Sequence, residues 1–354
     1  MRYSEFVFEN YCYDPASASL SLRYRFADGP RFEERLTFDF PSQPLPPAAA
    51  AVLDRIFRLI FLFSGVSYYK AFVPPRLACE AFPLDHQTAE FLQGFYENGL
   101  AEFAWKNQIS LQGHCEFHAD AVAAPAPIAL ELPRRTCVPI GGGKDSVVTL
   151  ECLKAGGEDL VLFSLGDAQP IAACIAAAKR PMIRVHRRLD PSLLKLNDNG
   201  ALNGHVPITG ILSAIVLACA VLSGFDTIAM SNEHSASAPN LIAGGVGINH
   251  QFSKSLEFEQ VFSAYIDNHI SPDIAYFSLL RPLSEIEIAR RFSRYRQYFK
   301  SFRSCNTAFR QSLAERGRHW CCDCPKCRFV FLALAPFVAK TELIGIFGRH
   351  ILRG

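Results

Sequence analysis

The chain has 354 residues, of which 49% are hydrophobic and 20% are charged. This composition excludes a disordered or fibrous protein, and the length is sufficient for two domains with a large apolar core. The net charge of +2 is too small for the strongly basic surface that a nucleic-acid-binding protein usually carries, so we expect no nucleic-acid partner.

The first ten residues, MRYSEFVFEN, lack the basic and apolar segments of a secretory signal. We therefore expect a cytoplasmic protein whose twelve cysteines are buried thiols, metal ligands or reactive groups rather than disulfides. Residues 206–225 carry no charge and approach the roughly twenty residues of a membrane span. Because they include Pro207 and Gly210 and lie between strand-like segments, we expect a core helix and no membrane association.

The N-terminal part of the chain shows mixed periodicity. Apolar and polar residues alternate over the first forty residues, which predicts strands. A proline-rich joint follows, and then helical patterns over residues 51–63 and 86–96. A second joint lies near residues 124–133. We therefore expect an α+β domain that contains β-strands over residues 1–130.

Beyond this joint, short apolar runs alternate with helical patterns. Such alternation predicts a doubly wound α/β domain, with a parallel sheet covered by helices on both faces, over residues 131–354. The expected strands are 136–140, 160–164, 182–185 and 227–231, and the expected helices are 147–154, 170–179 and 208–223.

The segment VPI-GGGKDS-VVTLECL lies between a predicted strand and a predicted helix. Three glycines allow positive φ and a close approach of a ligand to the backbone. The helix that follows directs its free N–H groups toward the loop, and Lys144 and Ser146 add donors, so the segment predicts an anion site. A purely structural turn is the alternative. A Walker loop does not fit because Asp145 follows Lys144, and a dinucleotide fingerprint would need a third glycine at a different spacing.

The segment GGGKDS resembles the SGGxDS pyrophosphate loop (PP-loop) of the ATP pyrophosphatase superfamily, whose members adenylate a carbonyl or carboxyl oxygen and release pyrophosphate. The resemblance implies that Asp145 helps to hold Mg²⁺ and that Ser146 touches pyrophosphate; magnesium suits a site of carboxylate and phosphate oxygens. Gly141 stands where the pattern usually has serine, which removes one hydroxyl donor. The candidate ATP-binding residues are Gly141, Gly142, Gly143, Lys144, Asp145, Ser146 and, after the next strand, Ser164.

A cysteine cluster follows near the end of the chain. Cys321, Cys324 and Cys327 have C-x2-C-x2-C spacing, and Cys305 lies upstream. Four thiolates around zinc form a closed structural site, and the preQ0 synthase branch of the same superfamily carries a similar terminal cluster. The adjacent Cys322 is an extra candidate ligand. The alternative is a set of buried or reactive thiols without metal, which could include a catalytic cysteine.

Four blocks in order, SNEHSASAPN, NHQFSKSLEFE, LLRPLSEIEIARRF and CPKCRFVFLALAPF, resemble the ATP-dependent UDP-N-acetylmuramoyl-L-alanyl-L-glutamate epimerase family of bacterial cell-wall synthesis. The resemblance covers most of residues 8–347. It implies inversion of the terminal L-glutamate of UDP-MurNAc-L-Ala-L-Glu to D-glutamate, for peptidoglycan synthesis and hence cell shape and division. Members of this family continue beyond IFGRHILRG, so we expect a C-terminal segment to be missing.

The reaction implied by the resemblance needs a group that removes the glutamate α-proton. An acyl-adenylate carries no carboxylate charge, so a positioned base can take that proton and an acid can return it on the opposite face. A lone histidine is more often structural than catalytic, but several polar groups fall in loops near the predicted sheet edge. Lys254 could instead hold a phosphate or carboxylate, and Glu233 and Glu257 could instead hold magnesium. The candidates are His205, Glu233, His234, His250, Lys254 and Glu257.

Three other interpretations stay open. A PP-loop enzyme that modifies tRNA, or a ligase of the preQ0 type, would share the loop and the cysteines. A regulatory protein could bind ATP without turnover.

Two other segments have simple structural explanations. The strands carrying Arg23, Tyr24 and Arg25 could cover the UDP-sugar or form a scaffold. Glu285 and Glu287 follow Ser284 as ordinary residues of a helix start. The pattern gives no indication of the oligomeric state.

Overall fold

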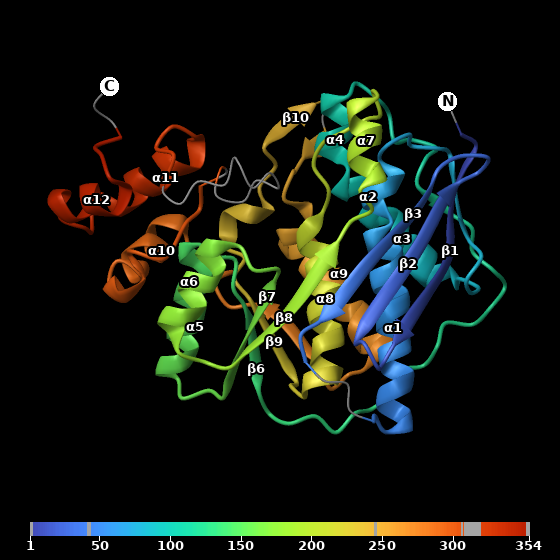
Figure 1. Ribbon diagram of the computed structural model, residues 1–354, viewed down its shortest axis with the longest axis horizontal. Coiled ribbons are helices and arrows are strands. Elements are labelled where there is room, and N and C mark those ends of the chain that lie inside the picture. Colours follow the sequence, from blue (N-terminus) through green and yellow to red (C-terminus); the bar gives the residue numbers. More distant parts are fainter. Residues whose placement is uncertain (1–2, 41–43, 244–245, 306, 308–319, 352–354) are drawn as a thin grey trace. The chain divides into compact units, whose positions relative to one another are not determined.

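The computed structural model describes residues 3–40, 44–243, 246–305, 307 and 320–351, which form a mixed α/β protein (Figure 1). The chain forms two compact units, and it passes between them several times. The division into domains at residue 131 stays a prediction. Unit 1 comprises Met1–Pro133, Val185–Asp226 and Ala236–Ala275, and unit 2 comprises Arg134–Arg184, Thr227–Ser235 and Tyr276–Gly354.

The N-terminal strands of unit 1 are confirmed. Strands β1, β2 and β3 pair in antiparallel fashion, and their side chains alternate between buried and more exposed positions, as a half-buried sheet requires. Strand β4 runs parallel to β1, β5 runs parallel to β4, and residues 185–188 of β8 pair antiparallel with β3. The bounds are β1 Glu5–Asp14, β2 Ser19–Phe26, β3 Arg31–Phe38, β4 Arg76–Cys79, β5 Glu116–Phe117 and β8 Met182–Arg188.

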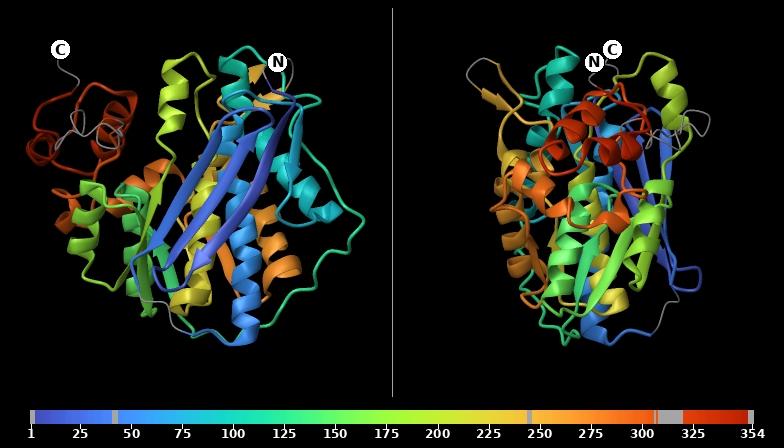
Figure 2. Two further views of the ribbon diagram at one scale, coloured as in Figure 1. Left: turned by 45° about the vertical axis from the view of Figure 1, so that its right-hand side comes forward. Right: turned by 90° about the vertical axis from the view of Figure 1, so that its left-hand side faces the viewer.

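Helices α1 and α8 pack against each other in unit 1, and they lie side by side behind strands β1–β3 in the left view of Figure 2. The middle of α8 is completely buried, so the uncharged stretch is a core helix, as predicted. None of the described helices is long and apolar enough to cross a membrane. The other bounds are α1 Pro47–Ser64, α2 Val66–Tyr69, α3 His86–Gly99, α4 Ala101–Lys106, α7 Ser192–Asp198, α8 Ile208–Ser223, β10 Leu241–Ala243, β11 Val246–Ile248, the 3-10 turn η2 Phe252–Lys254, α9 Leu256–Tyr265 and the π-helix η3 Ile266–Ile270.

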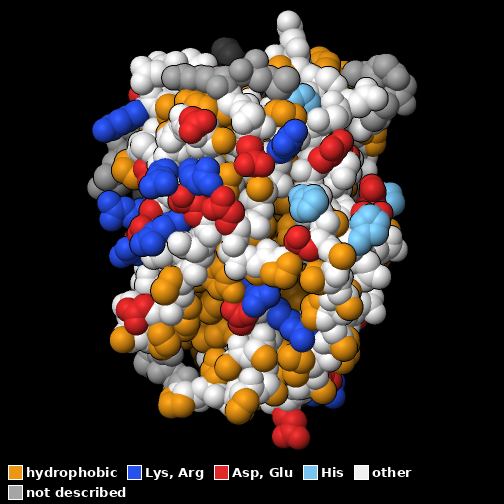
Figure 3. Space-filling view, turned by 90° about the vertical axis from the view of Figure 1, so that its right-hand side faces the viewer, with side chains coloured by type: hydrophobic (Ala, Val, Ile, Leu, Met, Phe, Trp, Pro, Cys, Tyr) orange, Lys and Arg blue, Asp and Glu red, His pale blue; other side chains and the backbone are white. Residues whose placement is uncertain are grey.

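Strand β2 carries the three side chains that were considered for covering the UDP-sugar, and covering it requires them to be exposed. Tyr24 is completely buried, and its hydroxyl donates to the Phe61 carbonyl at 2.8 Å, so the expectation that it is available to cover a sugar is wrong. Arg23 pairs with Glu33 at 3.1 Å, and basic side chains on the face drawn in Figure 3 lie next to acidic ones. The burial of Tyr24 and the ion pair of Arg23 favour a scaffold role for this sheet.

Unit 2 contains the predicted alternation of strands and helices. Strand β6 is parallel to both β7 and β9, and α5 packs against β6 (Figure 1). The strand order is β12-β9-β6-β7-β8, so successive strands extend to one side of β6 and then to the other. The bounds are β6 Thr136–Pro139, α5 Lys144–Ala155, β7 Leu160–Leu165, α6 Gln169–Ala178, β9 Thr227–Met230, the 3-10 turn η1 His234–Ser237, β12 Ala275–Ser278, α10 Glu285–Phe292, the 3-10 turn η4 Arg296–Tyr298, α11 Pro325–Leu334 and α12 Lys340–Phe347.

This strand order determines where a ligand would bind in unit 2. In an open α/β sheet, ligands bind beyond the carboxyl ends of the strands, where the order of the strands reverses. Here that point lies at β6 and β9, which are followed by the Gly141 loop and by the segment from Ser231 to His234. A buried apolar cluster beneath the loop includes Val138, Val147 and Leu162, and this cluster supports the strand and helix on either side of it.

Candidate functional site

The glycine loop, Gly141–Ser146, joins β6 to α5 at this reversal point. Gly142 has φ +77°, and a Cβ there would lie 3.1 Å from the Pro170 carbonyl carbon, so only glycine fits without strain. A Cβ on Gly143 would lie 2.9 Å from the Ser304 hydroxyl. Gly141 differs, because nothing lies within 4 Å of a Cβ built there. The loop therefore has the close packing of a backbone cradle, and its first position has room for a side chain.

The buried Lys144 forms ion pairs with the half-buried Asp145 and Glu285, and we call these three residues the lysine–carboxylate group. Lys144 Nζ donates to Asp145 Oδ1 at 2.5 Å and to Glu285 Oε2. Burial lowers the pKa of Lys144, but the two carboxylates outweigh this effect and hold the pKa above its ordinary value. Burial also raises the pKa of Glu285, against the opposing effect of Lys144. The group places a fixed cation and two carboxylates at the start of α5.

The segment after β9 meets the helix α10 region in unit 2. Glu233 is buried, its carboxylate accepts from the Ser235 N–H, and its carbonyl accepts from Arg281 Nη1 at 3.0 Å. The charge of Glu233 also acts on Glu285 and raises the pKa of that carboxyl. His234 is exposed, and its backbone N–H donates to the Leu283 carbonyl at 3.3 Å. Glu233 is therefore better placed than His234 to join the lysine–carboxylate group.

Sequence reasoning missed Glu285 and Arg303. Ser284 accepts from the Glu287 N–H as the N-cap of α10, as its position suggested, but Glu285 makes a contact with Lys144 that no local pattern reveals. The Arg303 backbone N–H donates to the Gly142 carbonyl at 2.7 Å. The only available signal for Glu285 was its place in the block LLRPLSEIEIARRF, and Arg303 stood in no motif.

The structure groups three other candidates in unit 1, which we call the histidine group: His205, His250 and Lys254. The two imidazole rings lie 6.0 Å apart, centroid to centroid. Burial lowers the pKa of His205, and the charges of His250 and Lys254 lower it further, whereas Glu102 raises it. At neutral pH His205 is therefore predominantly neutral, which is the state that a general base requires.

Neighbouring contacts hold the histidine group in place. Lys70 Nζ donates to Asn203 Oδ1 at 2.5 Å and to the Gly204 carbonyl at 3.1 Å, directly before His205. The His250 N–H donates to Asn240 Oδ1 at 2.9 Å. These contacts restrain the backbone next to His205 and at His250.

Two further candidates lie apart from these interactions. Glu257 is exposed in the first turn of α9, where a carboxylate suits the helix dipole. Ser164 is buried at the end of β7, and its hydroxyl points to the Met182 sulfur at 3.9 Å. The proposed roles of both residues in binding or catalysis stay predictions.

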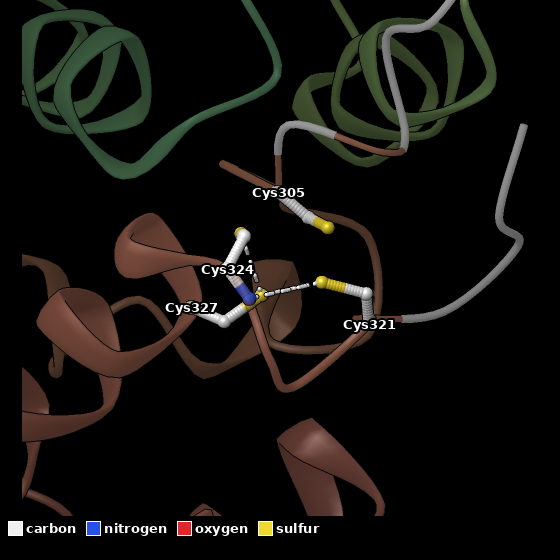
Figure 4. Close-up of side chains that lie close together, drawn as sticks. All are labelled: Cys305, Cys321, Cys324 and Cys327. Atoms are coloured by element: carbon white, nitrogen blue, oxygen red, sulfur yellow. Dashed lines mark hydrogen bonds between the residues drawn. The ribbon is translucent and has the colours of Figure 1, made fainter.

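The four predicted cysteine ligands come together in unit 2. The sulfur atoms of Cys305, Cys321, Cys324 and Cys327 all lie within 4.8 Å of one another and face a common space (Figure 4). All four are free thiols in the structure. Cys322 is different, because its sulfur lies 3.2 Å from the Phe347 carbonyl.

Family models and several known proteins match nearly the whole chain. A family model for the MurL N-terminal domain matches residues 1–279, and one for the MurL C-terminal domain matches residues 301–354. The chain is 43% identical over 350 residues to a UDP-N-acetyl-alpha-D-muramoyl-L-alanyl-L-glutamate epimerase of Xanthomonas oryzae pv. oryzae, covering 99% of this chain and 77% of the relative. Proteins with the same name from Micromonospora sp. and Salinispora tropica are 42% and 41% identical, again over 99% of this chain, and 79% and 77% of their own lengths are covered.

Proposed function

Because the chain belongs to the MurL family, we propose that it is an epimerase that inverts the terminal L-glutamate of UDP-MurNAc-L-Ala-L-Glu to D-glutamate. The observation that carries this proposal is the 43% identity, over 99% of the chain, to a relative that bears the name of this reaction. The product would serve peptidoglycan synthesis, as the substrate's name implies.

We further propose that the reaction consumes ATP and releases AMP and pyrophosphate. This step rests on the glycine loop, which combines a positive-φ glycine, a close-packed backbone and the N-terminus of α5 at the reversal point of a parallel sheet. These features suit a PP-loop fold of the doubly wound type. Lys144 would hold phosphate oxygens, and Asp145 with Glu285 would hold Mg²⁺, which supplies charge neutralisation at the phosphates.

Activation of the carboxylate explains why an inversion would need ATP. Removing the α-proton of a free carboxylate builds a dianion, whereas an acyl-adenylate has lost that negative charge and accepts the electrons of the breaking C–H bond. The glutamate carboxylate would attack the α-phosphate of ATP, and pyrophosphate would leave. After inversion, water would cleave the acyl–phosphate bond of the adenylate to give UDP-MurNAc-L-Ala-D-Glu and AMP.

For the proton transfer we propose His205 as the base, since burial keeps its imidazole neutral near pH 7. Lys254 and His250 are the charged or polar partners that act on it. Glu233 and His234 in unit 2 are the competing candidates. Exchange of the substrate α-proton with deuterium from the solvent separates these roles: a base variant loses exchange but keeps AMP formation.

The decisive experiment incubates the protein with UDP-MurNAc-L-Ala-L-Glu, ATP and magnesium, and then measures glutamate chirality, AMP and pyrophosphate. D-Glutamate that appears only with ATP, together with AMP, is the expected result. Pyrophosphate and AMP without inversion would mean that this substrate is adenylated but its α-proton is not transferred. The absence of both products would contradict the epimerase proposal and direct the search to tRNA and other carboxylate substrates. ATP binding with no product of either kind would favour a nucleotide sensor.

A further inference from the structure

We infer that Cys305, Cys321, Cys324 and Cys327 hold one tetrahedral zinc-class ion, and that this ion fixes the chain segment on which the glycine loop rests. The first part of the inference is independent of the proposed reaction. The second part rests on the proposed function, because it concerns the affinity of the loop for ATP.

The distances between the sulfur atoms fit four ligands around one ion. A tetrahedral zinc site with Zn–S bonds of about 2.3 Å has sulfur atoms about 3.8 Å apart. The sulfur of Cys327 lies 3.7 Å from that of Cys321 and 3.5 Å from that of Cys324, and no pair among the four exceeds 4.8 Å. A disulfide would instead need about 2.05 Å. A small movement of the side chains would complete the tetrahedron.

The surroundings also favour a closed structural site. Cys305 and Cys327 are completely buried, and the Cys324 N–H donates to the Cys321 sulfur at 3.4 Å. Cys324 is also the N-cap of α11, so the positive end of that helix faces the cluster and stabilises thiolate charge. Cys and zinc suit each other chemically, whereas magnesium and calcium prefer oxygen ligands.

Cys322 is excluded as a ligand by its own contacts. Its sulfur lies 3.2 Å from the Phe347 carbonyl and 3.5 Å from the Trp320 carbonyl, and it is 5% exposed. Its φ of +62° turns the chain between Cys321 and Asp323, so that the neighbouring thiol can face the cluster. Cys322 therefore provides a matched control: a buried cysteine beside the ligands that makes no contact with the ion.

The cluster is connected to the glycine loop by three consecutive residues. The Arg303 N–H donates to the Gly142 carbonyl at 2.7 Å, the Ser304 hydroxyl would lie 2.9 Å from a Cβ on Gly143, and Cys305 follows directly. Arg303 Nη1 donates to the Phe302 carbonyl at 2.6 Å, which further restricts the segment. An ion bound by Cys305 would hold this segment against the loop.

The test measures zinc in the purified full chain and in two variants, Cys324→Ser and Cys322→Ser. We expect about one zinc ion per chain in the native protein and in Cys322→Ser, and a large loss in Cys324→Ser. In the unaltered protein, cobalt exchanged for zinc should give the intense sulfur-to-cobalt absorption of a four-thiolate site. Because the cobalt measurement uses the unaltered protein, it tests for the four-thiolate site even if Cys324→Ser fails to fold. A native protein with neither zinc nor the cobalt absorption overturns the site.

The coupling is tested by amide hydrogen exchange over residues 141–146 and by ATP affinity, before and after zinc is removed with a chelator. Faster exchange in the loop and a several-fold weaker ATP affinity are expected, both restored by added zinc. An unchanged exchange rate in the loop overturns the proposed coupling between the ion and the loop. The zinc site itself would still be supported by the measured metal content. If the zinc-loaded protein binds no ATP, the ATP proposal fails, while the exchange rates still report on the coupling.

Discussion

Replacing Gly142 with alanine should weaken ATP binding much more than the same change at Gly141. Gly142 has φ +77°, where a residue with a Cβ costs roughly 1–2 kcal/mol. The added Cβ would also lie 3.1 Å from the Pro170 carbonyl carbon and 3.2 Å from the Ile171 nitrogen, which are backbone atoms that cannot rotate away. We therefore take about 2 kcal/mol as the total cost, which corresponds to a roughly 30-fold change in an equilibrium constant.

This cost can appear in two ways. If the loop keeps its conformation, the free energy of unfolding falls by that amount; if the loop relaxes, ATP binding must restore the conformation and its affinity falls. Isothermal titration with ATP and thermal unfolding of the same samples measure both. Gly141→Ala is the control, because nothing lies within 4 Å of its Cβ. If the two variants matched each other in affinity and in stability, the conformational argument for the loop would be refuted.

Four further predictions concern the histidine group, the neighbouring Lys70, the lysine–carboxylate group and the proposed metal requirement. If His205 is the base, the acid limb of the rate profile lies below pH 6.5; Lys254→Met should move it upward and Glu102→Gln downward, and a profile unchanged by both variants would contradict the assignment. Burial lowers the pKa of Lys70 from 10.5 to about 8. Between these values the unfolded chain binds more protons, so the free energy of unfolding should rise with pH there, and denaturant titration of Lys70→Met should lack that rise. Glu285→Gln should slow AMP formation at least tenfold, about 1.4 kcal/mol, with thermal unfolding showing an unchanged fold. Removing magnesium with EDTA should stop AMP formation, and added magnesium should restore it; full activity in EDTA would contradict a magnesium requirement.

Much of the fold was predictable because its signals are local. The helix after the glycine loop was expected from Val147 onward, and it begins at Lys144. A helix is recognised in a sequence by the spacing of its apolar residues. Because the first turn of α5 consists of the polar residues Lys144, Asp145 and Ser146, the pattern there resembles that of a loop. The short helices α2, α4 and α7 were missed for a similar reason, since a helix of four to seven residues spans at most two turns.

The candidate site was less predictable because its contacts join distant parts of the chain. The three glycines at 141–143 identified the loop from the motif alone. His205 and His250 were both named as candidate bases because of their residue type, but the sequence did not predict that their rings lie close together. The pairing of Lys144 with Glu285 depends on how α10 packs against α5. The burial of Tyr24 depends on which face of β2 meets α1, and alternation along a strand does not say which face that is.

The repeated passage of the chain between its two units has a consequence for biosynthesis. Unit 1 needs α8 to cover α1, and its last segment ends at Ala275. A ribosome must therefore release most of the polypeptide before the N-terminal strands can complete their hydrophobic core, and until then α1 exposes a row of phenylalanine and leucine side chains. A fragment ending at Pro133 should be insoluble or depend on chaperones. Evolution could not exchange such a unit as a single cassette, because three separate stretches of the gene encode it.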